Sequence, residues 1–278
     1  MNDDIRFAPA TAFSLDALAE IFTRAFEGYY YAQTLTAAMF AAKTRLESLD
    51  LHFSAVMLAG AEPCGIAVLG LRGERAWCGG FGVTAPMRGA GLAHRLAAEM
   101  LGRARAAGAR ECVLEVLTRN ERAIKTYARA GFRATRDLRI LEWSAPEGER
   151  PTGRAPELAE QAPARLLDRF AALHPAPAAW QRDLPALLAR GNLRGLALEE
   201  GEQTRAYALV ADSPNGGARV EDLAAEGVEQ AAALLLALRE RYARLISVNE
   251  PADSPLTAAF EAAGFVERDR QYEMAIRL

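Results

Sequence analysis

The segment VTAPMRGAGLAHRL, residues 83–96, combines residue types that suit the binding of an anion. Gly89 and Gly91 leave backbone N–H groups uncovered, and an Ala/Leu-rich run begins directly after them. Uncovered N–H groups at a helix start attract anions, because the helix dipole adds about 0.3–1 kcal/mol for each favourable charge. The segment predicts a phosphate-binding turn, although it also fits a plain turn. It lacks the Gly-Lys-Ser/Thr sequence of a nucleotide-binding P-loop.

The distribution of apolar residues predicts the elements around this turn. Apolar residues at helical spacing, with Ser14 in an N-cap position, predict helices, and short apolar runs between turns predict strands. The expected helices cover 14–26, 35–49, 92–107 and 121–130, and the expected strands cover 52–60, 64–73, 75–84, 111–117 and 134–143. This order predicts an α/β (α+β) fold, with a mixed, mostly antiparallel sheet flanked by helices.

Residues 144–157 contain three prolines and two glycines and form the expected linker between two domains. Beyond them, Phe260 aligns with Tyr127 and Gly264 aligns with Gly131 at one offset of 133 residues. We therefore expect two copies of one fold, a domain at 1–143 and a degenerate copy at 158–278. In the second copy, helices are expected at 158–173, 228–242 and before 263, and strands at 193–200, 204–212, 218–226, 245–249 and towards 278.

The composition indicates a protein with a large core and a weak net charge. Of its 278 residues, 51% are apolar and 25% are charged, and the net charge is −3. Residues 1–143 hold 18 Lys and Arg against 15 Asp and Glu, whereas residues 144–278 hold 15 against 21. This balance does not favour nucleic acid, and no apolar run reaches the ~20 residues that cross a bilayer. With three scattered cysteines and no signal-peptide pattern, we expect a cytoplasmic protein without nucleic-acid or membrane partners, with a homodimer left open.

Residues after the glycine turn extend the motif. The pattern in register is Arg-x-x-Gly-x-Ala at 88–93, Leu-Glu-Val at 114–116, Asn120, Ala123, Tyr127 and Gly-Phe at 131–132. On the expected helix, Asn120, Ala123 and Tyr127 share one face. With these residues, the segment 1–143 resembles the GNAT superfamily of acetyl-CoA-dependent N-acetyltransferases. Its later part is similar in motif to the ribosomal-protein alanine acetyltransferases.

The resemblance implies acetyl-CoA as co-substrate and no metal. The pyrophosphate would lie on the turn at 88–93, and the pantetheine arm would pair with the backbone of 81–84, where the N–H of Val83 would polarise the thioester carbonyl. Asn120 would contact the pantetheine arm or anchor the start of its helix. The expected donor-binding residues are Phe81, Val83, Arg88, Gly89, Ala90, Gly91, Leu92, Ala93, Asn120, Ala123 and Tyr127.

Acetyl transfer to an amine needs a base, because an ammonium group cannot attack a thioester. The resemblance implies Glu115 as this base, and Tyr127, twelve residues further on, as the acid near the sulfur. A thiol pKa near ~8.5 makes help from an acid useful rather than essential. A solvated Glu115 with water as the base, and a Tyr127 that only packs, are the open alternatives.

The acceptor side carries the sequence FEGYYY, residues 26–31. Adjacent tyrosines suit a pocket for a cationic or apolar group, and they also suit an interface or a core. The expected acceptor is a small-molecule or peptide amine, and the expected acceptor-binding residues are Glu27, Tyr29, Tyr30 and Tyr31. The histidines, His52, His94 and His174, have no metal-ligand spacing.

The second copy departs from the motif. LAAEGVEQAAA stands where the first copy has its glycine turn, and the carboxylates of Glu226 and Glu229 would repel a pyrophosphate. We therefore expect the second copy to be a scaffold or a wall of the acceptor site. The sequence as a whole predicts an N-acetyltransferase that works by direct attack in a ternary complex. Two alternatives stay open: an acetyl-CoA-binding regulatory module without turnover, and an acyltransferase that uses another acyl-CoA.

Overall fold

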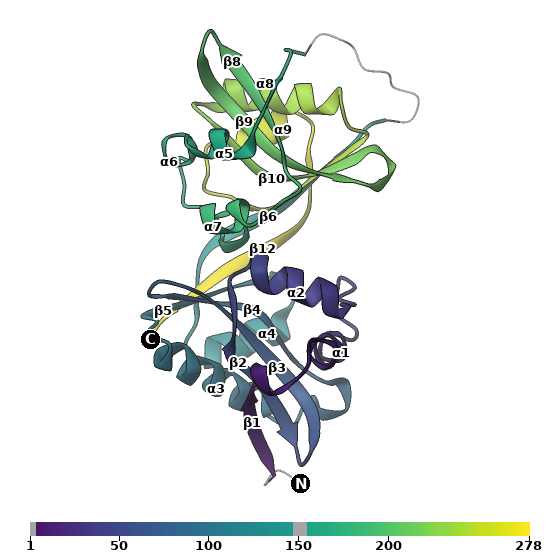
Figure 1. Cartoon of the computed structure of the whole chain (residues 1–278), viewed down its shortest axis with the longest axis vertical. Helices are drawn as coiled ribbons and strands as arrows, with labels where there is room; N and C mark the ends of the chain where they lie inside the picture. The colour runs from purple at the N-terminus through teal and green to yellow at the C-terminus, as the bar shows by residue number, and fades with distance from the viewer. Residues whose placement is uncertain (1–3, 147–154) are drawn as a thin grey trace. The chain divides into compact units, whose positions relative to one another are not determined.

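The chain folds into two compact units. Figure 1 shows the computed structural model, which describes residues 4–146 and 155–278. Unit 1 comprises Met1–Thr135 together with Glu273–Leu278, and unit 2 comprises Arg136–Tyr272. Each unit has a sheet flanked by helices, as the sequence predicts.

The division between the units falls inside two long strands, β6 (Arg133–Ser144) and β12 (Val266–Arg277). The last residues of the chain therefore belong to unit 1, where the N–H of Leu278 donates to the carbonyl of Arg110 at 2.9 Å. The domain limits expected from sequence, 143 and 158, lie elsewhere, and most of the expected linker lies outside the described residues.

The sheet of unit 1 has the strand order β1-β2-β3-β4-β5, followed by the end of β12. Neighbouring strands from β1 to β4 are antiparallel, and β4 and β5 are parallel. The strand bounds are β1 Ile5–Pro9, β2 Leu49–Ala59, β3 Glu62–Arg72, β4 Arg75–Val83 and β5 Glu111–Leu117. The central strand β3 is almost wholly buried, because helices pack on it.

In the described part of unit 1, four helices flank this sheet, each within a range where the sequence predicts a helix. They are α1 Leu15–Ala25, α2 Ala37–Leu46, α3 Leu92–Ala106 and α4 Glu121–Arg129. The hydroxyl of Ser14 accepts the N–H of Ala17 at 3.2 Å, and that of Thr36 accepts the N–H of Met39 at 3.2 Å. Helices α1 and α3 both pack on β3 and so form the core of unit 1.

The sheet of unit 2 has the order β6-β11-β10-β9-β8-β7, in which β10 and β11 are the parallel pair. The strand bounds are β7 Ala159–Gln161, β8 Arg194–Glu200, β9 Gln203–Ser213, β10 Gly217–Ala225 and β11 Arg244–Pro251. The helix bounds are α5 Pro163–Leu167, α6 Phe170–Leu173, α7 Leu184–Leu188, α8 Val228–Arg239 and α9 Thr257–Ala262. Alternate residues of β9 enter two different apolar clusters, so both faces of this sheet are covered.

One expected element is wrong. The sequence predicts a single helix over 158–173, whereas the structure has the short strand β7 and two short helices there. Pro163 explains the difference, because proline has no N–H and its ring clashes inside a helix. It therefore stands at the start of α5, where the missing N–H costs nothing.

The two units share a repeated strand pair. In unit 1, Gly79 is an extra residue of β4 opposite β3, and Trp77 pairs with Val113 of β5. In unit 2, Glu221 is the corresponding extra residue of β10 opposite β9, and Arg219 pairs with Ile246 of β11. The matching bulges therefore align Gly79 with Glu221.

Candidate active site

The glycine turn of unit 1 is open in the structure. Gly89 and Gly91 have φ of +87° and +76°, a region that favours glycine, and no described atom lies within 4 Å of where a Cβ would stand on either. Gly91 is the N-cap of α3, which has neither a side-chain cap nor an acidic residue in its first turn over its described length. The N–H groups at this helix start are therefore available to an anion.

Arg88, by contrast, is engaged with the protein backbone. Its guanidinium donates to the carbonyls of Val83 at 2.9 Å, Ala25 at 3.2 Å and Glu27 at 2.8 Å. The side chain thus ties the end of β4 and the glycine turn to the end of α1. Its expected contact with a pyrophosphate stays a prediction.

The parallel strands β4 and β5 diverge beside this turn. They pair over Arg75–Trp77 and Glu111–Val113, whereas β4 continues to pair with β3 as far as Val83. Beyond Trp77, in the described part of the chain, β4 does not pair with β5, and this edge of β4 is left open. The backbone of 81–84, expected to hold the pantetheine arm, lies along this edge.

Glu115 lies on β5, two residues beyond the last residue that pairs with β4, and its side chain is half-buried. The indole Nε1–H of Trp77 donates to its Oε2 at 2.7 Å. The ammonium of Lys43, from α2, lies 5.5 Å from the centroid of the Trp77 ring. The carboxylate is thus held by a buried aromatic side chain that sequence analysis did not single out.

Tyr127 lies on α4 and is 7% exposed. Its ring packs edge-on against Phe81 at 5.5 Å and Phe132 at 5.9 Å between centroids. Burial, reinforced by nearby Cys78, raises the pKa of Tyr127 well above its ordinary value, so the phenol keeps its proton at neutral pH. It can therefore donate a proton but does not carry a charge.

Glu115 and Tyr127 occupy one neighbourhood. Burial raises the pKa of Cys78 to about 12, and the charge of Glu115 also acts on this thiol. The same Cys78 acts on Tyr127. The structure therefore brings the expected base and acid to the same part of unit 1, with a neutral thiol within electrostatic range of both.

Asn120 anchors the start of α4. Its side-chain oxygen accepts the N–H of Ala123 at 3.3 Å, as an N-cap residue does. Of the two roles that the resemblance implies for Asn120, the structure shows this one.

The tyrosine segment after α1 contacts the turn between β5 and α4. The hydroxyl of Tyr30 donates to the carbonyl of Arg119 at 3.0 Å, and the guanidinium of Arg119 lies 4.6 Å from the Tyr30 ring and 5.6 Å from the Tyr31 ring. Tyr29 packs edge-on against Tyr30, and Glu27 is exposed. Arg119 is a second residue that sequence analysis missed, because its position in a turn carries no motif.

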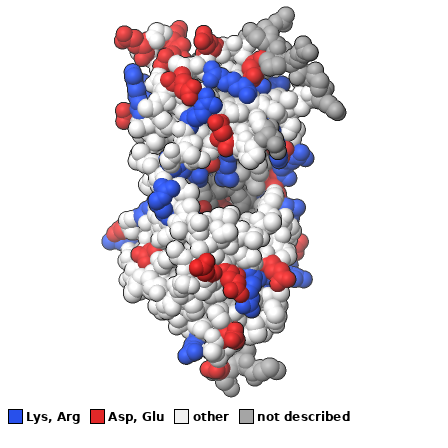
Figure 2. All heavy atoms as spheres, turned by 45° about the vertical axis from the view of Figure 1, so that its right-hand side comes forward, with Lys and Arg blue, Asp and Glu red and all other residues white. Residues whose placement is uncertain are grey.

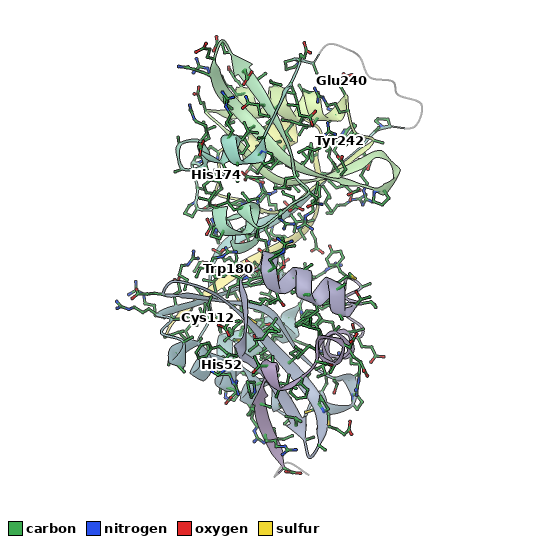
Figure 3. The ribbon with its side chains drawn as sticks, in the orientation of Figure 1. His52, Cys112, His174, Trp180, Glu240 and Tyr242 are labelled. Carbon is green, nitrogen blue, oxygen red and sulfur yellow. The ribbon has the colours of Figure 1, made fainter. Side chains whose placement is uncertain are left out.

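The histidines do not form a site with one another. His52 lies in unit 1 and His174 in unit 2 (Figure 3), and His94 is exposed on α3. The Nδ1–H of His174 donates to the carbonyl of Phe170 at 2.8 Å, and its Nε2 is hydrogen-bonded to Oδ1 of Asp222 at 2.9 Å. Among residues 4–146 and 155–278 no cluster of His, Cys, Asp and Glu could hold a metal ion. On the face shown in Figure 2, basic and acidic side chains are interspersed on the surface.

Residues 15–132 match the model of the acetyltransferase (GNAT) family. The chain carries a GNAT domain. The matched segment contains the glycine turn, Glu115 and Tyr127, and over these residues the chain has the acetyltransferase domain of the GNAT family. A search of curated proteins found no match. No helix in the described part of the chain is long and apolar enough to cross a membrane.

Solved structures share the fold of the whole chain. A putative acetyltransferase from Pyrococcus horikoshii is 15% identical with a TM-score of 0.70, covering 100% of this chain and 91% of that one. A GCN5-related N-acetyltransferase from Sphaerobacter thermophilus is 16% identical with a TM-score of 0.69, covering 100% and 96%. A tandem GNAT protein from the clavulanic acid biosynthesis pathway is 14% identical with a TM-score of 0.71, covering 98% of each chain. These likenesses show a tandem GNAT fold.

Proposed function

We propose that unit 1 transfers an acetyl group from acetyl-CoA to a primary amine by direct attack in a ternary complex. The observation that carries the proposal is the open turn at Gly89 and Gly91, which presents the uncapped start of α3 beside the unpaired edge of β4. A diphosphate fits the first feature, because N–H groups and the helix dipole favour negative charge. A peptide-like pantetheine arm fits the second, because strand edges bind extended backbones.

Glu115 acts as the general base in this proposal. It removes a proton from the ammonium form of the acceptor, and the amine nitrogen then attacks the thioester carbon. The half-buried position of its carboxylate, beside the last paired residues of β4 and β5, supports this role. Holding donor and acceptor together makes the attack an oriented, effectively unimolecular step.

Tyr127 acts as the acid. As the C–S bond breaks, the phenol donates its proton to the leaving thiolate. The nitrogen loses its second proton as the amide forms, and this proton returns to the phenol through solvent. Glu115 releases to solvent the proton that it took from the ammonium group. The place of its ring against Phe81 of the β4 edge supports the role, and the raised pKa means that the phenol is protonated at neutral pH. For the acceptor, we propose that Glu27, Tyr29, Tyr30 and Tyr31 line its site and that the N–H of Val83 polarises the thioester carbonyl.

We further propose that unit 2 is a scaffold that binds no donor. At the bulge, Glu221 replaces Gly79, and the next residue, Asp222, replaces Gly80. Asp222 is fully buried and bonded to His174, while Arg182 and Glu250 form a buried ion pair at 2.8 Å. At the bulge, unit 2 thus carries buried charged side chains, whereas unit 1 has glycines whose backbone packs against the rings of Trp77 and Phe22.

The space left beside this network is small. A pocket lined by His174, Arg182 and Glu250, among others, has a volume of ≈ 20 Å³, about the room of one water molecule. In the repeat, Phe260 of α9 stands at the position of Tyr127 and has no hydroxyl to act as an acid.

We also propose a cytoplasmic location. The three cysteines, Cys64, Cys78 and Cys112, are buried and form no disulfide, which supports it.

The deciding experiment is a calorimetric titration of the full chain with acetyl-CoA, followed by thiol release across an amine library. We expect one acetyl-CoA per chain and thiol release with at least one amine. Binding without thiol release from any amine would favour the regulatory module, and tighter binding of a longer acyl-CoA would favour the other acyltransferase. Two molecules per chain would refute the scaffold role of unit 2.

A further inference from the structure

Trp77 makes a direct contact with the proposed base. Its indole Nε1–H donates to Oε2 of Glu115 at 2.7 Å, a length typical of a hydrogen bond to an ionised group. The contact joins β4 to β5 immediately before the two strands diverge, because Trp77 pairs with Val113, two residues before Glu115. The donor therefore stands at the last point where the sheet itself fixes the position of β5 relative to β4.

The Trp77 ring is held in place on several sides. Its side chain is buried, with the residue 2% exposed. A Cβ on Gly79 would stand 2.3 Å from Cζ3 of the ring, so the bare backbone at the bulge is what admits the indole. On α2, the ammonium of Lys43 lies over the ring and forms an ion pair with Glu47. A donor fixed in this way costs little entropy when it holds a carboxylate.

We propose that Trp77 is a positioning residue for acetyl transfer, whose indole N–H orients the Glu115 carboxylate and keeps it ionised for proton removal. The proposal rests on the proposed role of Glu115 as base. An N–H that donates to a carboxylate favours the ionised form over the protonated form. The ionisable groups nearby include Lys43 on α2 with its partner Glu47, Cys78 on β4 and Tyr127 on α4. Burial raises the pKa of Cys78 to about 12 and that of Tyr127 well above its ordinary value, so both groups are neutral.

The test compares Trp77→Phe with Glu115→Gln and with the double variant. Phenylalanine keeps an aromatic ring and removes the donor, and Trp143→Phe, at a 7% exposed tryptophan of unit 2, is the matched control. We expect W77F to lower kcat about tenfold, as for the loss of a hydrogen bond to a charged group, with the acetyl-CoA KM unchanged. The acid limb of its pH–rate profile should move to higher pH, and W143F should keep the wild-type profile.

The double variant separates positioning from packing. If Trp77 acts through Glu115, W77F lowers kcat no further in the E115Q background. An equal loss in both backgrounds, or a W77F variant with the wild-type kcat and pH profile, would overturn the proposal. If E115Q itself keeps full activity, the assignment of the base fails, and this outcome is distinct from an inactive E115Q with an unaffected W77F.

A second replacement covers the case in which W77F does not fold. Benzothienylalanine at position 77 keeps the bicyclic shape of the indole and has sulfur in place of the N–H. Acetyl-CoA affinity, measured by calorimetry, reports whether unit 1 is intact. With affinity unchanged, the same fall in kcat and the same move of the acid limb are expected, and a wild-type profile would refute the role of the N–H.

Discussion

Tyr127 has surroundings that keep its phenol neutral. Its ring lies between Phe81 and Phe132, and burial raises its pKa. We expect Tyr127→Phe to lower kcat on the order of tenfold and to change the acetyl-CoA KM less, because the ring contacts stay and the proton is lost. Steady-state kinetics check this, with Tyr242→Phe of unit 2 as the control. A wild-type kcat in Y127F would mean that Tyr127 only packs.

His174 of unit 2 makes stability depend on pH. Burial alone would lower its pKa, but the hydrogen bond to Asp222 and the charge of Asp222 raise it above the ordinary 6.5. The protonated form therefore stabilises the fold, fully below about pH 6.5 and progressively less as pH rises through the raised pKa.

The expected outcome is a urea midpoint for unit 2 that falls between pH 6 and pH 8.5. Unfolding followed by circular dichroism measures it. His174→Gln should remove much of this dependence, because glutamine can bond Asp222 but does not titrate, whereas the exposed His52→Gln should keep it. Identical pH dependence in H174Q and the wild type would contradict the assignment.

At the scale of elements, the start of α3 decides donor binding. Gly91 is its N-cap, with positive φ and open space around the missing Cβ. We expect Gly91→Glu to abolish measurable acetyl-CoA binding in calorimetry, because the side chain strains the backbone and its charge repels phosphate. Gly102→Glu, on the same helix and also in open space, adds the same charge and should bind normally. Unchanged affinity in G91E would remove the phosphate-binding role of the turn.

Local sequence predicted most elements but not every boundary. Ser14 and Asn120 cap the helices that the sequence predicts to begin there, because a cap depends on residues three positions apart. Thr36 caps α2 in the same way, although the sequence analysis did not single it out. The helix expected over 158–173 is wrong because one proline outweighs the apolar spacing around it. The bulge at Gly79 carries no signal that could be separated from an ordinary strand glycine.

At the scale of the whole molecule, unit 1 depends on the far end of the chain. Within unit 1, Met274 is buried, the hydroxyl of Thr135 donates to the carbonyl of Glu273 at 3.0 Å, and Leu278 bonds Arg110. We expect deletion of Glu273–Leu278 to destabilise unit 1 by about 2–5 kcal/mol, the scale for losing one buried methionine side chain.

Thermal unfolding and acetyl-CoA affinity together measure this effect. Arg277→Ala, which changes an exposed residue of the same segment, is the control and should behave as the wild type. If the deleted chain melts and binds as the full chain does, the segment contributes no stability to unit 1.

The sequence by itself determined the glycine turn, most of the strands and helices and the repeat, and its resemblance to a family supplied the expected base and acid. These follow from spacing within a few residues, which fixes local geometry and carries a family's motif. Only the tertiary structure decided that Trp77 holds Glu115, that Arg88 bonds the end of α1, and that Glu273–Leu278 belongs to unit 1. The first two contacts join residues that are 38 and 63 positions apart. No local pattern encodes such contacts, because they form only when distant strands and helices pack together.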